Sequence, residues 1–221
     1  MRKIIFILIA LVGFQTKMTA QNLSFKTWMG ASYEQKVKIK KFKFDVSVAQ
    51  QLRISDLGYV PKYSTFTELG VSKGITDFYK IGIDYRATYI GGFKNRLSLS
   101  NSFKVNLDPI TLDFRLKYQA NFEARKPFSQ DLRLKTTVSY KANKDFSPYV
   151  FGEILFHNTY NFSNFDEYRV GFGLEADYKK EHRFDVMLMM AQDLNLENPG
   201  RSIVLALEYK FSKESKKKAK K

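Results

Sequence analysis

The chain has 221 residues, no cysteine, 20 Phe, 13 Tyr and a formal net charge of +15. The lack of cysteine excludes a disulfide framework, a thiolate zinc site, a catalytic thiol and a lipid-modified cysteine anchor. A charge this positive can indicate a nucleic-acid surface, but Lys and Arg are spread over every strand-like segment rather than clustered on one element. We therefore expect no nucleic-acid partner.

The N-terminus has the three-part form of a secretory signal peptide. Arg2 and Lys3 precede an apolar run over 4–14, and the small residue Ala20 follows. The apolar core is roughly ten residues long, whereas a transmembrane anchor needs about 20. We expect residues 1–20 to be removed near Ala20 and the mature chain to be exported. No later segment is apolar enough for a membrane helix, so membrane residence would require strands.

After the signal, the chain alternates apolar and polar positions in one segment after another. These segments are 25–39, 42–54, 65–73, 78–89, 95–106, 110–122, 130–141, 146–156, 168–178, 183–194 and 201–211. Because successive side chains of a strand point to opposite faces, each segment would have one apolar and one polar face. Helical periodicity is not seen, so the sequence predicts an all-β fold.

Segment 168–178 shows the alternation most clearly. Tyr168, Val170, Phe172, Leu174, Ala176 and Tyr178 alternate with Arg169, Gly171, Gly173, Glu175 and Asp177. The tyrosines lie at the two ends of the apolar face, as in a strand that crosses a bilayer with aromatic side chains at both headgroup levels. About eleven residues is also the length that a tilted strand needs to span the apolar layer.

The connections between segments alternate in length. Those near 74–77, 106–109, 141–145 and 179–182 are short, and those near 55–64, 123–129, 157–167 and 194–200 are longer. Short periplasmic turns and longer outer loops are typical of outer-membrane barrels. The sequence therefore predicts a transmembrane, antiparallel, up-and-down β-barrel of about 10–12 strands over residues 21–211.

The strand count raises a problem of parity. Bacterial barrels normally have an even number of strands. If the last strand descends to the periplasm, counting back through the connections starts residue 25 on the outer side. Either segment 25–39 lies outside a ten-stranded barrel, or the barrel has twelve strands.

The polar faces carry a recurring charge pattern, which we predict to form a lattice in the lumen. Its members are Arg53, Asp84, Arg86, Arg96, Asp113, Arg115, Lys117, Asp131, Arg133, Lys135, Glu153, Arg169 and Glu175. Carboxylate and arginine recur two residues apart, which places both on one face within reach of neighbouring strands. Facing lipid, each charge would cost about 2–4 kcal/mol at the midplane. The lattice would either pack a narrow barrel shut or line a channel for small anionic solutes.

Chemistry beyond this lattice is sparse. The only histidines are His157 and His182. His157, near Ser163, suggests a lipid-modifying barrel enzyme as an alternative, but no further motif supports the pair. We expect His157 to lie in a surface loop, His182 to lie solvated in a turn, and the protein not to be an enzyme. Without a phosphate-binding glycine loop or clustered metal ligands, we expect no cofactor.

The last strand-like segment ends on Phe211, which resembles the C-terminal signal that the barrel assembly machinery recognises. The basic run 212–221 follows it, and we expect this tail to be disordered and periplasmic. The expected partners are therefore outer-membrane lipid, the assembly machinery and small anionic solutes.

Several short stretches resemble the DUF2490 family of outer-membrane β-barrels. They are Phe25-Lys-Thr-Trp28, Gln51-Leu-Arg53, the Asp-x-Arg strands and Pro148-Tyr-Val-Phe-Gly-Glu153. The resemblance covers most of the mature chain and implies a Gram-negative outer-membrane barrel, with no activity or catalytic residues to carry over. The size and basic lumen also resemble small porins for acidic oligosaccharides. The leading interpretation is a passive pore or structural barrel, and a further alternative is a secreted soluble β-protein that binds a ligand.

Overall fold

A computed structural model describes residues 23–39, 42–56, 62–89, 93–124, 126–159, 162–179, 181–194 and 200–213. The expected signal peptide and the tail from residue 214 onward lie outside the described residues. No helix in the described part of the chain is long and apolar enough to cross a bilayer.

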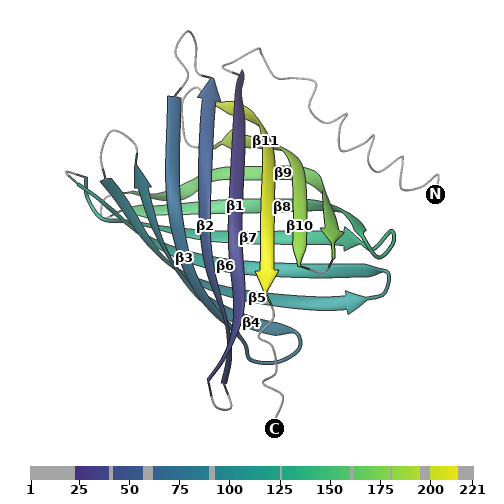
Figure 1. Ribbon diagram of the computed structural model, residues 1–221. Coiled ribbons are helices and arrows are strands. Elements are labelled where there is room, and N and C mark those ends of the chain that lie inside the picture. Colours follow the sequence, from purple (N-terminus) through teal and green to yellow (C-terminus); the bar gives the residue numbers. More distant parts are fainter. Residues whose placement is uncertain are drawn as a thin grey trace.

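Eleven strands form one closed barrel in the described residues (Figure 1). They are β1 (Leu23–Ile39), β2 (Phe42–Asp56), β3 (Lys62–Gly74), β4 (Tyr79–Tyr89), β5 (Phe93–Leu107), β6 (Ile110–Glu123), β7 (Ser129–Tyr140), β8 (Phe146–Thr159), β9 (Phe162–Tyr178), β10 (His182–Asp193) and β11 (Arg201–Lys213). Each strand pairs antiparallel with the next in sequence, which confirms the all-β, up-and-down barrel of about 10–12 strands.

Closure corrects the expectation of an even count. With eleven strands, β1 and β11 run in the same direction, and they pair in parallel from Leu23↔Arg201 to Gln35↔Lys213. Segment 25–39 is therefore part of the wall rather than outside it, and no twelfth strand is needed. A parallel ladder satisfies the backbone groups of both edges as an antiparallel one would, so parity does not prevent closure.

The two ends of the barrel differ. The connections after β1, β3, β5, β7 and β9 lie at one end, which we call the turn end, and those after β2, β4, β6, β8 and β10 lie at the other, the loop end. One expectation was wrong here. Residues 157–167 do not form a long loop, because β8 continues to Thr159 and β9 begins at Phe162, with a register shift at Leu155/Phe156.

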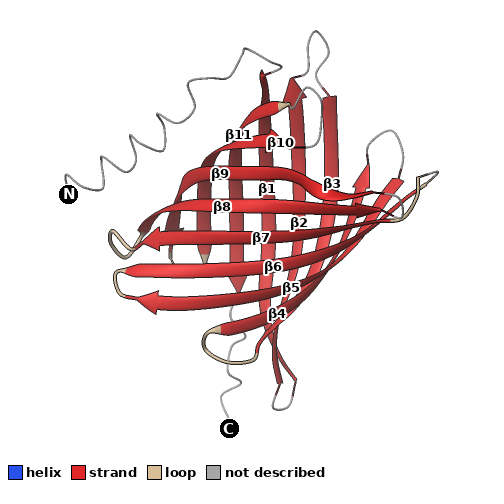
Figure 2. Cartoon of the chain, turned by 180° about the vertical axis from the view of Figure 1, so that it is seen from behind, coloured by secondary structure: helices blue, strands red, loops and turns tan. Residues whose placement is uncertain are grey.

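The wall separates an apolar outside from a mixed inside. On β9, Val170, Phe172 and Leu174 face outward, and Phe172 is 59% exposed in the isolated chain. Their odd-numbered neighbours face the lumen, as the alternation predicts. Seen from opposite sides, β1–β3 and β11 cross the strands β5–β8 of the far wall at a steep angle (Figures 1 and 2).

An apolar cluster occupies one side of the lumen. Tyr149, Phe151, Met189 and Val204 are buried together, with Trp28 and Met187 packed against them. The rings on β8 fit because β9 presents glycine opposite each, with Phe151 paired to Gly171 and Tyr149 to Gly173. A Cβ on Gly171 would lie 2.7 Å from the Phe151 ring, and one on Gly173 would lie 2.5 Å from the Tyr149 ring.

Candidate functional site in the lumen

Arginines and aromatic rings are layered at mid-height on the β1–β4 side of the lumen. The guanidinium carbon of Arg53 lies 4.1 Å from the ring centroid of Trp28 and 4.9 Å from that of Phe66. The guanidinium of Arg86 lies 3.7 Å from the same Phe66 ring. Arg86 also forms an ion pair with Glu68 at 2.6 Å. Stacking on ring faces stabilises these desolvated cations while filling space between the strands.

A carboxylate holds two more arginines on the opposite side. Glu153 is 5% exposed, and its Oε2 accepts from Arg133 at 2.7 Å and from Arg169 at 3.1 Å. Arg169 also pairs with Glu167. Its guanidinium carbon lies 5.8 Å from the Trp28 ring, which joins this side to the aromatic layer. Both arginines bond the same oxygen of this buried carboxylate, so two cations share Glu153.

These groups come from both sides of the barrel wall. Arg53 interacts electrostatically with four further arginines, which project from β4, β5, β7 and β9; they are Arg86, Arg96, Arg133 and Arg169. Together with the apolar cluster, they form what we call the mid-lumen belt, made up of these five arginines, Glu68, Glu153, Trp28, Phe66 and the cluster side chains. The members of the belt are buried or half-buried and come from both sides of the barrel.

A hydrogen-bonded network lies on the loop-end side of the belt. Asp131 accepts from Asn121 Nδ2 at 2.9 Å and lies 2.6 Å from Nδ1 of His157. Asn121 Oδ1 in turn accepts from Arg96 Nε at 2.6 Å. The expectation of a loop histidine was therefore wrong: His157 lies in β8 and points into the lumen, because Asp131 is its direct cross-strand partner. Ser163 pairs with Asn158, and its side chain lies outside the described part.

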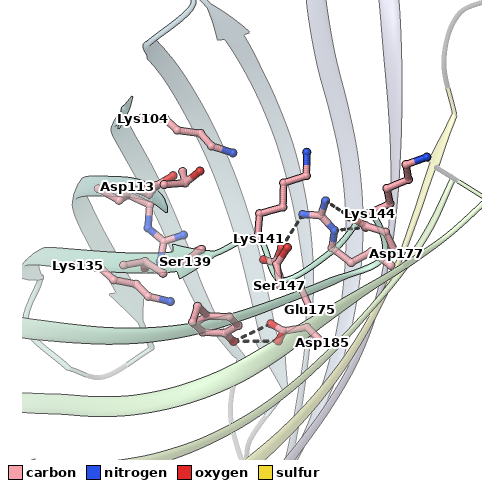
Figure 3. A pocket seen from close by; sticks show the side chains of 15 residues that line it. Lys104, Asp113, Lys135, Ser139, Lys141, Lys144, Ser147, Glu175, Asp177 and Asp185 are labelled. Carbon is pink, nitrogen blue, oxygen red and sulfur yellow. Dashed lines mark hydrogen bonds and ion pairs between the residues drawn. The ribbon is translucent and has the colours of Figure 1, made fainter. Parts of the chain in front are cut away.

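A cavity of about 610 Å³ lies on the turn-end side of the belt (Figure 3). Lys141 and Lys144 of the β7–β8 turn line it, and so does Tyr149 of the belt. The lining holds six cations and four carboxylates, an excess of two positive charges. The cavity is thus a cation-rich chamber on the turn-end side of the belt.

The acids of this chamber are largely engaged. Arg183 pairs with Asp177 at 2.7 Å and with Glu175 at 3.2 Å. The Tyr149 hydroxyl donates to both oxygens of Asp185, at 2.9 and 3.1 Å (Figure 3). Much of the negative charge on the β9–β10 side is therefore already paired.

The structure places the expected lattice residues in three groups and one separate pair. Arg53, Arg86, Arg96, Arg133, Glu153 and Arg169 belong to the belt, Asp131 to the loop-end network, and Asp113, Arg115, Lys135 and Glu175 to the cavity. Asp84 and Lys117 pair with each other at 2.8 Å, across the intervening β5. Two of the three Asp-x-Arg pairs, Asp84/Arg86 and Asp131/Arg133, use partners on other strands rather than each other. Asp113 and Arg115 form no ion pair with a described residue.

The sequence prediction missed the aromatic part of the site. On β1 and β3 the odd-numbered residues form the apolar face, but Trp28 and Phe66 stand at even positions and so on the polar face. On β8, Tyr149 and Phe151 share a face with Glu153. An aromatic residue on the polar face of a strand was the signal that could have identified them. Such a residue fills the lumen when a glycine or an arginine stands opposite.

His182 is also placed differently from the expectation. It begins β10, its Nδ1 lies 2.7 Å from the Tyr209 hydroxyl, and its ring lies 5.0 Å from that of Phe211. It therefore belongs to a group of aromatic side chains at the turn end rather than to a solvated turn. Within the described ranges, no group of three or more His, Asp or Glu side chains is placed to hold a metal ion.

The fold and the site together define a class, that of closed β-barrels with an apolar outer wall and an ionic lumen. The family model "Protein of unknown function (DUF2490)" matches residues 25–200, and the chain belongs to this family. No curated protein matches it in sequence. Among solved structures it is similar to a protein described as a bacterial polysaccharide outer membrane secretin, with a TM-score of 0.49 and 9% identity over 79% of this chain and 74% of that one.

Proposed function

We propose that the protein is an integral β-barrel of the outer membrane, with a lumen closed at mid-height and a cation-rich chamber that favours anionic solutes. The observation that carries the membrane proposal is the apolar surface on the outside of the barrel wall. Every strand places large apolar side chains on its outer face, including Leu69, Ile83, Leu134 and Val186. A monomeric soluble protein seldom exposes so large a continuous apolar surface, whereas lipid covers it without cost.

Aromatic pairs border this outer apolar surface at both ends of the barrel. At the loop end, Tyr89 lies 5.3 Å from Phe93 and Phe156 lies 5.6 Å from Phe165, measured between ring centroids. At the turn end, Tyr79 stacks on Phe103 at 4.7 Å and Tyr33 lies 5.8 Å from Phe211. Two girdles of aromatic side chains are what the two headgroup levels of a bilayer favour. We infer that the turn end faces the periplasm.

The mid-lumen belt favours a structural barrel over an open passive pore. Ion flow needs a continuous aqueous path, and the mid-lumen belt interrupts it with buried side chains such as Glu153 and Val204. The excess of cations on the chamber wall still favours anions there, because a low-dielectric wall focuses the potential.

Location is tested by fractionation and by heat-modifiable migration on gels. We expect the protein in the outer-membrane fraction, migrating faster before heating than after it because the barrel stays folded. Recovery as a soluble periplasmic protein would contradict the membrane proposal.

The state of the lumen is tested by conductance in planar bilayers. We expect no steady current from the wild type, and anion-selective current from Trp28→Ala/Phe66→Ala, which removes the rings that hold Arg53. The matched control is Met29→Ala/Leu69→Ala, which truncates outward side chains on the same strands and should stay closed. A large steady current from the wild type would contradict the closed lumen, and a cation-selective variant would contradict the charge argument.

A further inference from the structure

Two cations face each other on the chamber wall. Arg115 of β6 and Lys135 of β7 are direct cross-strand partners, and both line the cavity. Like charges placed directly opposite each other on neighbouring strands destabilise a sheet. A fold retains such a pair most easily when an anion lies between or above the two groups.

The carboxylates that interact electrostatically with Lys135 already hydrogen-bond to other side chains. The other cross-strand neighbour of Lys135 is Glu153, which already accepts from Arg133 and Arg169. The ammonium group of Lys135 instead lies 4.3 Å from the centroid of the Phe151 ring. Neither Arg115 nor Lys135 forms an ion pair with a described residue.

A third cation extends the wall. Lys104 of β5 lines the same cavity, and Figure 3 shows its side chain reaching into the open space. Its cross-strand partner is Asp113, yet the two form no described ion pair. The hydroxyl groups of Thr137 and Ser139 lie on the same strand as Lys135 and offer further hydrogen bonds.

We propose that Lys104, Arg115 and Lys135 form a binding site for a water-soluble anion that carries phosphate or carboxylate groups. The planar guanidinium of Arg115 can hold two oxygens at once, while the lysines act as point charges. A cavity of about 610 Å³ accommodates a small hydroxyl-bearing molecule as well as its anionic group, such as a sugar phosphate or a sugar acid. The ligand is a solute rather than lipid, because the barrel wall separates the site from the outer apolar face.

This site deepens the proposed function, and its preference for anions rests on that function. Binding to the site requires neither a conducting pore nor a bilayer. Binding can therefore be measured by calorimetry on the full chain folded in neutral detergent, with inorganic pyrophosphate and citrate as probes. We expect saturable binding that weakens as salt is raised. A barrel that fails to conduct but binds supports the site, whereas a barrel that binds neither probe overturns it.

Two variants locate the binding. Arg115→Gln/Lys135→Gln should lower the affinity at least about tenfold, because each lost group makes charged hydrogen bonds. Lys94→Gln/Lys126→Gln removes the same charge at the loop end, where both lysines pair with Glu123, and should change the affinity less than about twofold. Equal losses in the two variants would show attraction to net charge alone and would overturn the site.

A measurement on the wild type covers the case in which the cavity variant does not fold. Lysine acylation by a water-soluble ester, followed by mass spectrometry, should be slowed at Lys104 and Lys135 by bound pyrophosphate and unchanged at Lys94. Equal acylation of all three with and without the probe would overturn the proposal.

Discussion

Replacing Gly171 by alanine tests whether the lumen is packed as tightly as the structure shows. A Cβ at this position would lie 2.7 Å from the Leu188 carbonyl oxygen, from Met189 Cβ and from the Phe151 ring. The carbonyl oxygen is a backbone atom and the Met189 Cβ is bonded directly to the backbone, so neither can move without shifting β10. Gly152 is the matched control, because a Cβ there meets no atom within 4 Å.

The magnitude follows from two opposing effects. Overpacking a closely packed core costs about 1–3 kcal/mol. Alanine also restricts the unfolded chain, which stabilises the folded state by about 0.4–1 kcal/mol. We expect Gly171→Ala to lower the free energy of unfolding by about 1–2 kcal/mol, and Gly152→Ala to leave it unchanged or raise it slightly. Adding Phe151→Leu to Gly171→Ala should restore part of the loss, since it relieves one of the three contacts.

The assay is urea unfolding of the barrel refolded in lipid vesicles. Trp28 is the only tryptophan of the chain and packs against the apolar cluster, so its fluorescence reports on this part of the lumen. Equal stability of the two glycine variants, within about 0.5 kcal/mol, would refute the close packing around Gly171.

Three further predictions concern the outer face, the belt and the chemistry. Leu174→Arg should destabilise folding into bilayers by about 2–4 kcal/mol, and Glu175→Gln should be milder; equal effects would show that the faces are assigned wrongly. Glu153→Gln should lower the free energy of unfolding by about 3–5 kcal/mol in the same urea assay, because it leaves buried arginines without their carboxylate, and a change below about 1 kcal/mol would contradict the belt. Purified protein should show no phospholipase or deacylase turnover, and turnover that disappears in His157→Ala would contradict this.

Most of the fold could be predicted from alternation alone. The expected boundaries of the segment 110–122 differ from those of β6 by one residue, because strict period-two patterning over membrane length is a strong local signal. Strand number was harder. Which edge strands meet depends on closure over the whole chain, and no local pattern distinguishes a parallel seam from an antiparallel one.

The candidate site was predictable in composition but not in arrangement. Charges such as Arg133 were placed on the inner face by parity, since lipid would reject them. The ion-pair partners of these charges depend on strand tilt and register. For example, tilt and register decide that Asp84 pairs with Lys117 on β6 rather than with a residue of the adjacent β5. Residues 157–167 were misjudged because polar composition resembles a loop, although polar side chains also suit strands that extend beyond the apolar belt.

The parallel seam between β1 and β11 has a consequence for the order of folding. Every other pair forms between neighbours in sequence, but the hydroxyls of Ser24 and Ser202, 2.9 Å apart, join residues separated by 178 positions. Each doubling of the closed loop costs about 0.6 kcal/mol of entropy, so closing the seam costs about 2–3 kcal/mol more than closing a hairpin of about ten residues. Successive hairpins can therefore form a curved, open sheet first, with the seam closing last and separating first on unfolding. The open intermediate exposes two free edges, and bringing them together is the step that an assembly catalyst would accelerate most.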